Sequence, residues 1–189
     1  MKQISWQFFI ASPWVEVPLD EIVDELRDYD ERLRIILRKH MAILGWWCIA
    51  HALVAIPGML FLRGPWWFFS MMNAIWAIVN FVIVIFLFRH VGRQQFTRGP
   101  AYSRFLVQGH VEKMMLLNVG LDLAYFCAGL YLHTLGRVPT VSHPDLWTGF
   151  GWSVIIQGVF LLIHDGLGYR LHHRNFRKAL PFLRETLQR

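Results

Sequence analysis

Cysteine is scarce in this chain, and it has none of the spacings that are typical of disulfide frameworks or metal centres. The 189 residues include two cysteines, Cys48 and Cys127, and no CxxC pair. Both lie inside long apolar stretches, where a thiol commonly packs as a small hydrophobic group. We therefore expect no redox pair and no thiolate metal site, and we expect both side chains to be buried in the core.

Charged residues are also few, which argues against a soluble domain. They make up 17% of the chain, below the roughly 25% of a soluble domain. Hydrophobic residues make up 55%, and the mean hydropathy is +0.36. This composition predicts a membrane protein whose partners are membrane lipids. A pI near 9.7 does not indicate nucleic-acid binding, because no recognition motif accompanies the basic residues.

The N-terminus lacks the pattern of a cleaved signal peptide. The stretch WQFFIASPWVEV, residues 6–17, is apolar but short, with one lysine before it and no small-residue cleavage pattern. We expect this segment to be retained and to lie at the membrane surface.

Residues 18–40 predict an amphipathic helix. Pro18 suits the first helical position, and acidic residues fill the first half of the segment while basic residues close its last turn, which complements the helix dipole. Apolar residues recur at roughly helical spacing, namely Leu19, Ile22, Val23, Leu26, Leu33 and Leu37. We expect an interfacial region over residues 1–40 that leads into the first membrane span.

Four apolar segments follow, and each is long enough to cross about 30 Å of hydrocarbon at 1.5 Å per residue. They predict an all-α, four-helix transmembrane bundle over residues 41–169, followed by a basic tail at 170–189. A polar, basic loop is expected over residues 89–113. The predicted spans are 41–62, 66–87, 113–134 and 147–169.

Lysine and arginine are distributed unevenly along the chain, which predicts its orientation. Seventeen of the nineteen fall before residue 41, between 89 and 113, or after Tyr169, and the two other loops hold only Arg63 and Arg137. Basic residues favour the cytoplasmic side. Both termini and the central loop are therefore predicted to be cytoplasmic.

The two halves of the bundle share short patterns that favour a parallel repeat. MNAIWAIVN in the second span aligns with IQGVFLLIH in the fourth, and HALVAIPG in the first aligns with DLAYFCAG in the third. This alignment pairs Asn73 with Gln157, Asn80 with His164, and His51 with Asp122.

Polar residues inside the spans are the candidate site. An aspartate at a helix centre costs about 2.5–3.5 kcal/mol on insertion scales, so such residues should face the bundle interior and find partners. Asn118, Asp122 and Tyr125 follow one face of the third span, and His51 is a possible partner for Asp122. The candidate ligand-binding residues are His51, Asn73, Trp76, Asn80, Asn118, Asp122, Tyr125, Gln157 and Asp165. The alternative is that the amides and histidines only join helices by hydrogen bonds.

Spacing argues against three familiar chemistries. The HxxxH and HxxHH motifs of membrane di-iron enzymes are absent. A b-type haem is disfavoured because His51 and His164 differ in predicted depth by roughly 6 Å. Ser153 has no histidine within reach to act as a base. We therefore predict no metal and no cofactor.

Three segments together resemble a known family. MMNAIWAIVNF, LLNVGLDLAYFCAGLYL and GFGWSVIIQGVFLLIHD are similar to the signature segments of bacterial four-span membrane proteins that are catalogued as a domain of unknown function. This chain has Ala77 where that family often has Asn, and His164 where Phe is usual. The resemblance implies a bacterial inner-membrane protein and brings no activity with it.

Three function classes remain open at this stage. The first is a polar intramembrane pocket that binds a lipid or another hydrophobic small molecule, with Asp122 as a possible acid–base catalyst and Phe160 and Trp76 as apolar walls. The second is a proton or ion pathway through Asp122, His51 and Asp165, within the bundle or at the interface of a homo-oligomer. The third is a membrane scaffold that recruits a partner without a ligand. Whether the protein is an enzyme is left open.

Overall fold

The computed structural model describes residues 19–93 and 101–188, so the prediction for residues 1–18 lies outside it. Within these ranges the chain forms four α-helices and no strand, which confirms the all-α prediction. The helices are α1 (Leu19–Phe61), α2 (Pro65–Arg93), α3 (Ala101–Leu135) and α4 (Pro144–Gln188).

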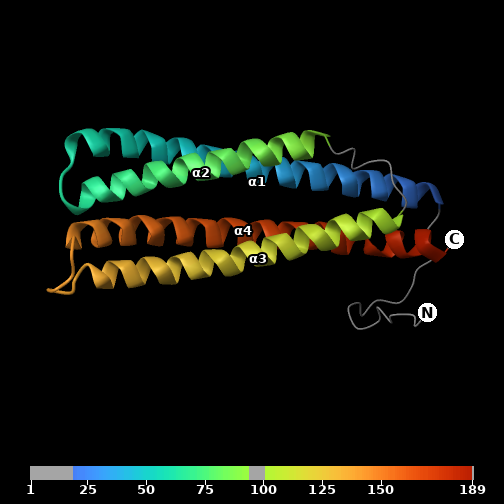
Figure 1. Cartoon of the computed structure of the whole chain (residues 1–189). Coiled ribbons are helices and arrows are strands. Elements are labelled where there is room, and N and C mark those ends of the chain that lie inside the picture. The colour runs from blue at the N-terminus through green and yellow to red at the C-terminus, as the bar shows by residue number, and fades with distance from the viewer. Residues whose placement is uncertain (1–18, 94–100, 189) are drawn as a thin grey trace.

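The helices form two long hairpins that lie along each other (Figure 1). α1 and α2 make one hairpin, and α3 and α4 make the other. Both tight connections lie at one end of the bundle, here called the turn end. α1 begins and α4 ends at the opposite end, called the terminal end. α4 is the central element, because it packs against all three other helices.

α1 and α4 are each continuous well beyond the length of a membrane span. α1 has 43 residues and α4 has 45, so each is roughly 65 Å long at 1.5 Å per residue, about twice the hydrocarbon thickness. The predicted interfacial helix and basic tail are therefore not separate segments. They are the ends of these two helices, and neither boundary, at residue 40 or at residue 169, interrupts the helix.

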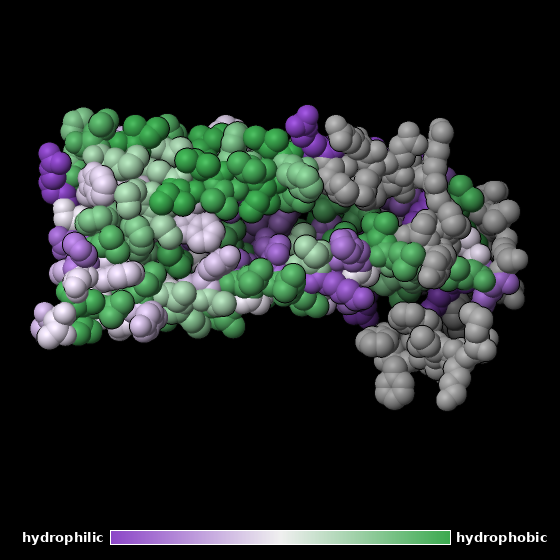
Figure 2. Space-filling view, in the orientation of Figure 1, coloured by the Kyte–Doolittle hydropathy of each residue, from purple (hydrophilic) through white to green (hydrophobic). Residues whose placement is uncertain are grey.

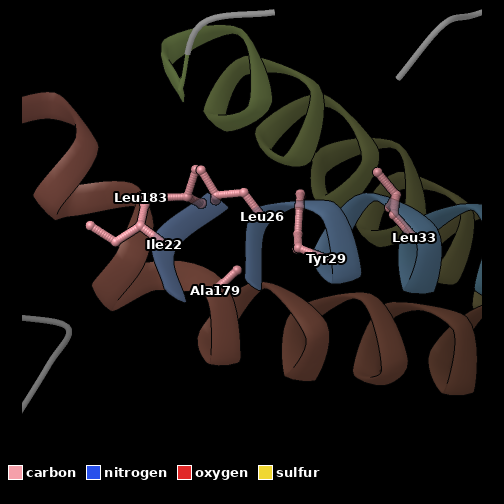
Figure 3. Packing of buried hydrophobic residues seen from close by; sticks show 6 residues of the cluster. All are labelled: Ile22, Leu26, Tyr29, Leu33, Ala179 and Leu183. Atoms are coloured by element: carbon pink, nitrogen blue, oxygen red, sulfur yellow. The ribbon is translucent and has the colours of Figure 1, made fainter. Parts of the chain in front are cut away.

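The extra length of α1 and α4 is held by an apolar core at the terminal end (Figure 3). Its α1 side follows the helical spacing seen in the sequence, and its α4 side presents Ala179, which is fully buried and allows close approach. The core residues are Ile22, Leu26, Tyr29, Leu33, Ala179 and Leu183. Each Å² of apolar surface that is buried stabilises the fold by about 25 cal/mol. This core therefore stabilises the packing of the two helix ends.

The connection between α2 and α3 is shorter than the sequence predicted. α2 continues to Arg93 and α3 already begins at Ala101, so the polar loop expected over residues 89–113 is wrong for most of its length. Residues 101–112 extend α3 instead. Their polar side chains include Arg104 and Gln108, which bond to α1, and tertiary bonding therefore explains a helix that hydropathy alone did not indicate.

Each tight turn contains a left-handed residue followed by proline. Gly64 has φ of 58° and precedes Pro65, the first residue of α2. His143 has φ of 58° and precedes Pro144, the first residue of α4. Proline suits the first helical position because its missing N–H would have no partner there.

All four helices are long and apolar enough to cross a membrane. Figure 2 shows hydrophobic side chains over most of one face between the turn end and the middle of the bundle. Large apolar side chains such as Trp46, Phe86 and Tyr131 are mostly exposed in the isolated chain, as expected for a surface that meets lipid. Cys48 is buried as predicted, but Cys127 is exposed on α3, so its assignment to the core is wrong.

Candidate functional site

A chain of paired polar side chains joins α1, α2 and α4 in the middle of the bundle. The Trp47 indole donates to Gln157 Oε1 at 2.9 Å, and Gln157 Nε2 lies 3.0 Å from His51 Nδ1. The same His51 nitrogen lies 3.0 Å from Asn73 Oδ1, which also accepts a hydrogen bond from the Ser153 hydroxyl at 2.8 Å. One nitrogen cannot donate and accept at once, so the tautomer of His51 selects either Asn73 or Gln157 as its partner.

This paired network fits a structural role for its members. His51, Asn73, Ser153 and Gln157 are all buried and bonded to one another. Buried polar groups that satisfy each other fix the relative positions of the helices that carry them. The predicted pairing of His51 with Asp122 is not what the structure has, because His51 bonds to α2 and α4 instead.

A second set of polar atoms in the bundle has no hydrogen-bond partner among the described residues. On α2 these atoms are Asn73 Nδ2, Trp76 Nε1 and Asn80 Nδ2, and on α3 the atom is Asp122 Oδ2. All four are buried. Leaving such an atom unpaired costs about 1–3 kcal/mol, so a row of them is a site where a bound group would gain hydrogen bonds.

Three of the unpaired atoms belong to one face of α2. Asn73, Trp76 and Asn80 are separated by three and four residues, so they share that face. The Trp76 ring meets Tyr125 of α3 edge-on, with centroids 5.1 Å apart, and Asp122 is about one turn before Tyr125. This contact joins one predicted residue of the second span to one of the third.

The backbones of α2 and α3 are not packed against each other, although each packs on α4. Figure 2 shows hydrophilic side chains at the bottom of a recess between these two helices, near the middle of the molecule. We call this hollow the α2–α3 recess. Of the predicted α3 residues, Asp122 is buried, Asn118 is half-buried and Tyr125 is 37% exposed, so the tyrosine belongs to the rim rather than the interior.

A third polar group lies nearer the terminal end, between α1 and α4. His40 Nε2 is 3.2 Å from Asp165 Oδ1, and the His164 ring stacks on His40 with centroids 3.8 Å apart. The sequence predicted Asp165 as a site residue, but it gave His40 no role, because His40 was counted as the last residue of an interfacial helix.

The terminal end carries buried polar bonds outside the predicted spans. Arg104 of α3 forms an ion pair with the buried carboxylate of Asp30 at 3.0 Å, and the Tyr29 hydroxyl donates to Gln108 Oε1 at 3.0 Å. Burial raises the pKa of the Asp30 carboxyl, and the Arg104 guanidinium acts in the opposite direction. These bonds attach α3 to α1 where their backbones are not in contact.

An apolar groove of about 390 Å³ lies between α1 and α2. Its lining is hydrocarbon and aromatic apart from Arg89 on α2, and the residues are Met41, Ala42, Gly45, Trp46, Ile49, Phe81, Val84, Ile85, Phe88 and Arg89. It lacks the polar atoms of the α2–α3 recess, so it suits a hydrocarbon chain rather than a polar head group.

Comparison with protein families identifies the group to which the chain belongs. Residues 43–166, about two thirds of the chain, match the model described as Family of unknown function (DUF6992). The protein is a member of this family. The match spans the paired network, the α2–α3 recess, Asp165 and the α3 residues Arg104 and Gln108, but it excludes His40 and the apolar core at the terminal end. No curated protein and no solved structure matches the chain.

Proposed function

We propose that this protein is an integral membrane protein that binds the polar head of a membrane-dissolved amphiphile in the α2–α3 recess. Membrane insertion is supported by four helices of sufficient length and hydropathy and by the apolar exposed surface. Seventeen of nineteen basic residues fall before residue 41, between 89 and 113, or after Tyr169, which favours a cytoplasmic location for these segments. In a bacterium this would be the inner membrane.

The observation that carries the proposal is the set of unpaired atoms on one face of α2 and on Asp122 of α3. Three donors, on Asn73, Trp76 and Asn80, accompany the unpaired carboxylate oxygen of Asp122. Water does not reach a hydrocarbon interior to bond such groups. A ligand with acceptor oxygens, such as a hydroxyl, carbonyl or ester, would pair with the donors and remove their desolvation cost.

The position of the recess supports entry from the lipid phase. α2 and α3 are joined by aromatic side chains, Trp76 and Tyr125, rather than by packed backbones. Two side chains can move aside more readily than two helices can separate, so an amphiphile could enter sideways while its apolar tail remains among lipid chains. Tyr125, which is partly exposed, would then lie beside the neck of the ligand.

Asp122 is the residue positioned for chemistry if a reaction follows binding. Its unpaired Oδ2 atom could accept or return a proton at a bound hydroxyl or carbonyl. The hydrogen bonds of His51 and Gln157 are already used within the paired network, so this pair is better suited to holding the helices than to contacting a ligand. This division of roles favours ligand binding over a proton pathway through His51.

Native mass spectrometry of the protein released from nanodiscs tests the proposal. The wild type should carry a discrete added mass, and both Asp122→Asn and Trp76→Phe should lose most of it. Trp66→Phe is the matched control, because Trp66 is 55% exposed at the turn end and should leave the adduct unchanged. A bare wild type would overturn the proposal, as would an adduct of equal occupancy in all four proteins.

A further inference from the structure

Three potential metal ligands from α1 and α4 converge between these two helices. His40, His164 and Asp165 each offer one ligand atom, and these atoms all lie within 4.8 Å of one another. His40 Nε2 is 3.2 Å and His164 Nε2 is 4.0 Å from Asp165 Oδ1. The side chains are 12%, 6% and 9% exposed, respectively, so the group is enclosed by the bundle.

The packing around these residues holds both imidazole rings in place. His164 is stacked between Phe160 on one side and His40 on the other, with centroid separations of 5.5 and 3.8 Å. Gly168 makes room for His40, since a Cβ at residue 168 would lie 2.8 Å from the His40 ring. These contacts keep both side chains beside Asp165.

An ion pair between His40 and Asp165 does not account for the rest of the group. If His40 donates to Asp165, His164 Nε2 still has no partner among the described residues. His164 is more than nine-tenths buried, so an unpaired ring nitrogen there is costly.

We propose that His40, His164 and Asp165 bind one divalent first-row transition-metal ion. Three protein ligands would leave the fourth tetrahedral position open. Mixed nitrogen and carboxylate ligands favour Zn²⁺ or Fe²⁺, whereas Mg²⁺ and Ca²⁺ prefer oxygen alone. No thiolate takes part.

The separations are close to those that a metal requires. Bonds of about 2.0–2.2 Å in a tetrahedral site place ligand atoms roughly 3.3–3.5 Å apart. His40 Nε2 and Asp165 Oδ1 already meet this at 3.2 Å. His164 Nε2 must approach Asp165 by roughly half an ångström. One of the two stacked rings must also turn out of the stack, because parallel rings cannot both direct their in-plane lone pairs at one ion.

This inference is independent of amphiphile binding. Its three ligands are outside the set of recess atoms. His164→Phe should remove the metal and leave the amphiphile adduct in place, because phenylalanine preserves the stacking on Phe160 and His40. In the wild type, Co²⁺ binding without an adduct would show that the amphiphile proposal fails, and an adduct without Co²⁺ binding would show that the metal proposal fails.

The test is Co²⁺ titration of tag-free, full-length protein in detergent, followed by visible absorption. The wild type should bind one equivalent with the d–d bands of a tetrahedral site, and Zn²⁺ but not excess Mg²⁺ should remove the bands. His164→Phe and Asp165→Asn should each weaken binding by at least about tenfold. His133→Gln is the matched control, because His133 belongs to α3 near the turn end, and it should bind as the wild type does.

Several results would overturn the metal site. These are absence of Co²⁺ binding by the wild type, equal affinity in the wild type and Asp165→Asn, or a thiolate charge-transfer band that indicates Cys48 or Cys127 as a ligand. Asp165→Asn keeps the size and shape of the side chain, so it decides the question even if His164→Phe does not fold. Elution in gel filtration and tryptophan fluorescence verify the fold of each variant.

Discussion

Gly158 of α4 lies directly against the backbone of Phe126 in α3. A Cβ on Gly158 would be 2.7 Å from the Phe126 amide nitrogen and 3.0 Å from its Cα, so the two helices approach as closely as main chains allow. Gly129 of α3 and Gly151 of α4 are in similar contact with the opposite backbone. This hairpin is assembled by small residues, which is the usual way for helices to associate in lipid.

Replacing one of these glycines should separate the helices. We expect Gly158→Ala to lower the free energy of unfolding by about 1–3 kcal/mol, because the new methyl group has only rigid backbone to displace. Gly166→Ala is the control on the same helix, since a Cβ at residue 166 meets nothing within 4 Å. It should be neutral or slightly stabilising through helix propensity. Unfolding by SDS titration measures both, and equal losses would contradict the close approach.

The paired network should contribute to stability rather than to ligand binding. Gln157→Leu removes a hydrogen-bond partner of both Trp47 and His51. It should lower the free energy of unfolding by about 1–2 kcal/mol. Val159→Ala, on the partly exposed face of α4, is the control and should cost less. The same unfolding assay applies. A Gln157→Leu variant of normal stability that lost the amphiphile adduct would show instead that the glutamine contacts the ligand.

Breaking the buried ion pair of Asp30 and Arg104 should lower the free energy of unfolding far more than breaking an exposed ion pair. Arg104→Ala leaves a buried carboxylate without its ion-pair partner and should cost about 3–5 kcal/mol. Arg27→Ala is the matched control, because its ion pair with Asp24 is 72% and 66% exposed and should contribute less than about 1 kcal/mol. Thermal unfolding of both variants at neutral pH makes the comparison, and similar losses would contradict it.

The cost of Arg104→Ala should also depend on pH in a defined direction. Burial raises the pKa of Asp30 in the folded state, and removal of the arginine raises it further. A carboxyl whose folded pKa exceeds its unfolded value destabilises the fold as pH rises through the folded pKa, and it has no such effect below the unfolded pKa of about 3.9. The difference in the free energy of unfolding between the wild type and Arg104→Ala should therefore shrink as the pH falls toward 4. A deficit that grew in acid would contradict this sign.

His172 should be replaceable by an apolar residue. Its side chain is fully buried, and neither ring nitrogen has a partner among the described residues. His172→Leu should leave stability unchanged or raise it by about 1 kcal/mol, because an unpaired polar group is removed. His173→Leu, which removes the contact with Glu112 at 3.1 Å, should be slightly destabilising. A large loss in His172→Leu would reveal an additional partner for that ring.

Hydropathy alone determined the class of fold and the approximate extent of the apolar helices. Long apolar segments separated by glycine and proline can only satisfy their backbone hydrogen bonds in lipid as helices or closed barrels, and their length and composition favour helices. The same cost of burying polar groups selected most of the candidate site. Asn73, Asn80 and Asp122 were identified in this way, whereas Trp76 was predicted as an apolar wall. All four retain buried unpaired atoms in the structure.

Tertiary contacts decided which polar residues pair and where the helices end. His51 could have bonded to any helix at its depth, and only the packing of α1 on α2 and α4 directs it to Asn73 and Gln157. The loop expected over residues 89–113 is largely helical because Arg104 and Gln108 find buried partners on α1. His40 joins Asp165 for the same reason, since a helix that continues through the predicted boundary at residue 40 places its side chains against α4. Hydropathy follows from each residue separately, whereas these pairings depend on the approach of distant segments.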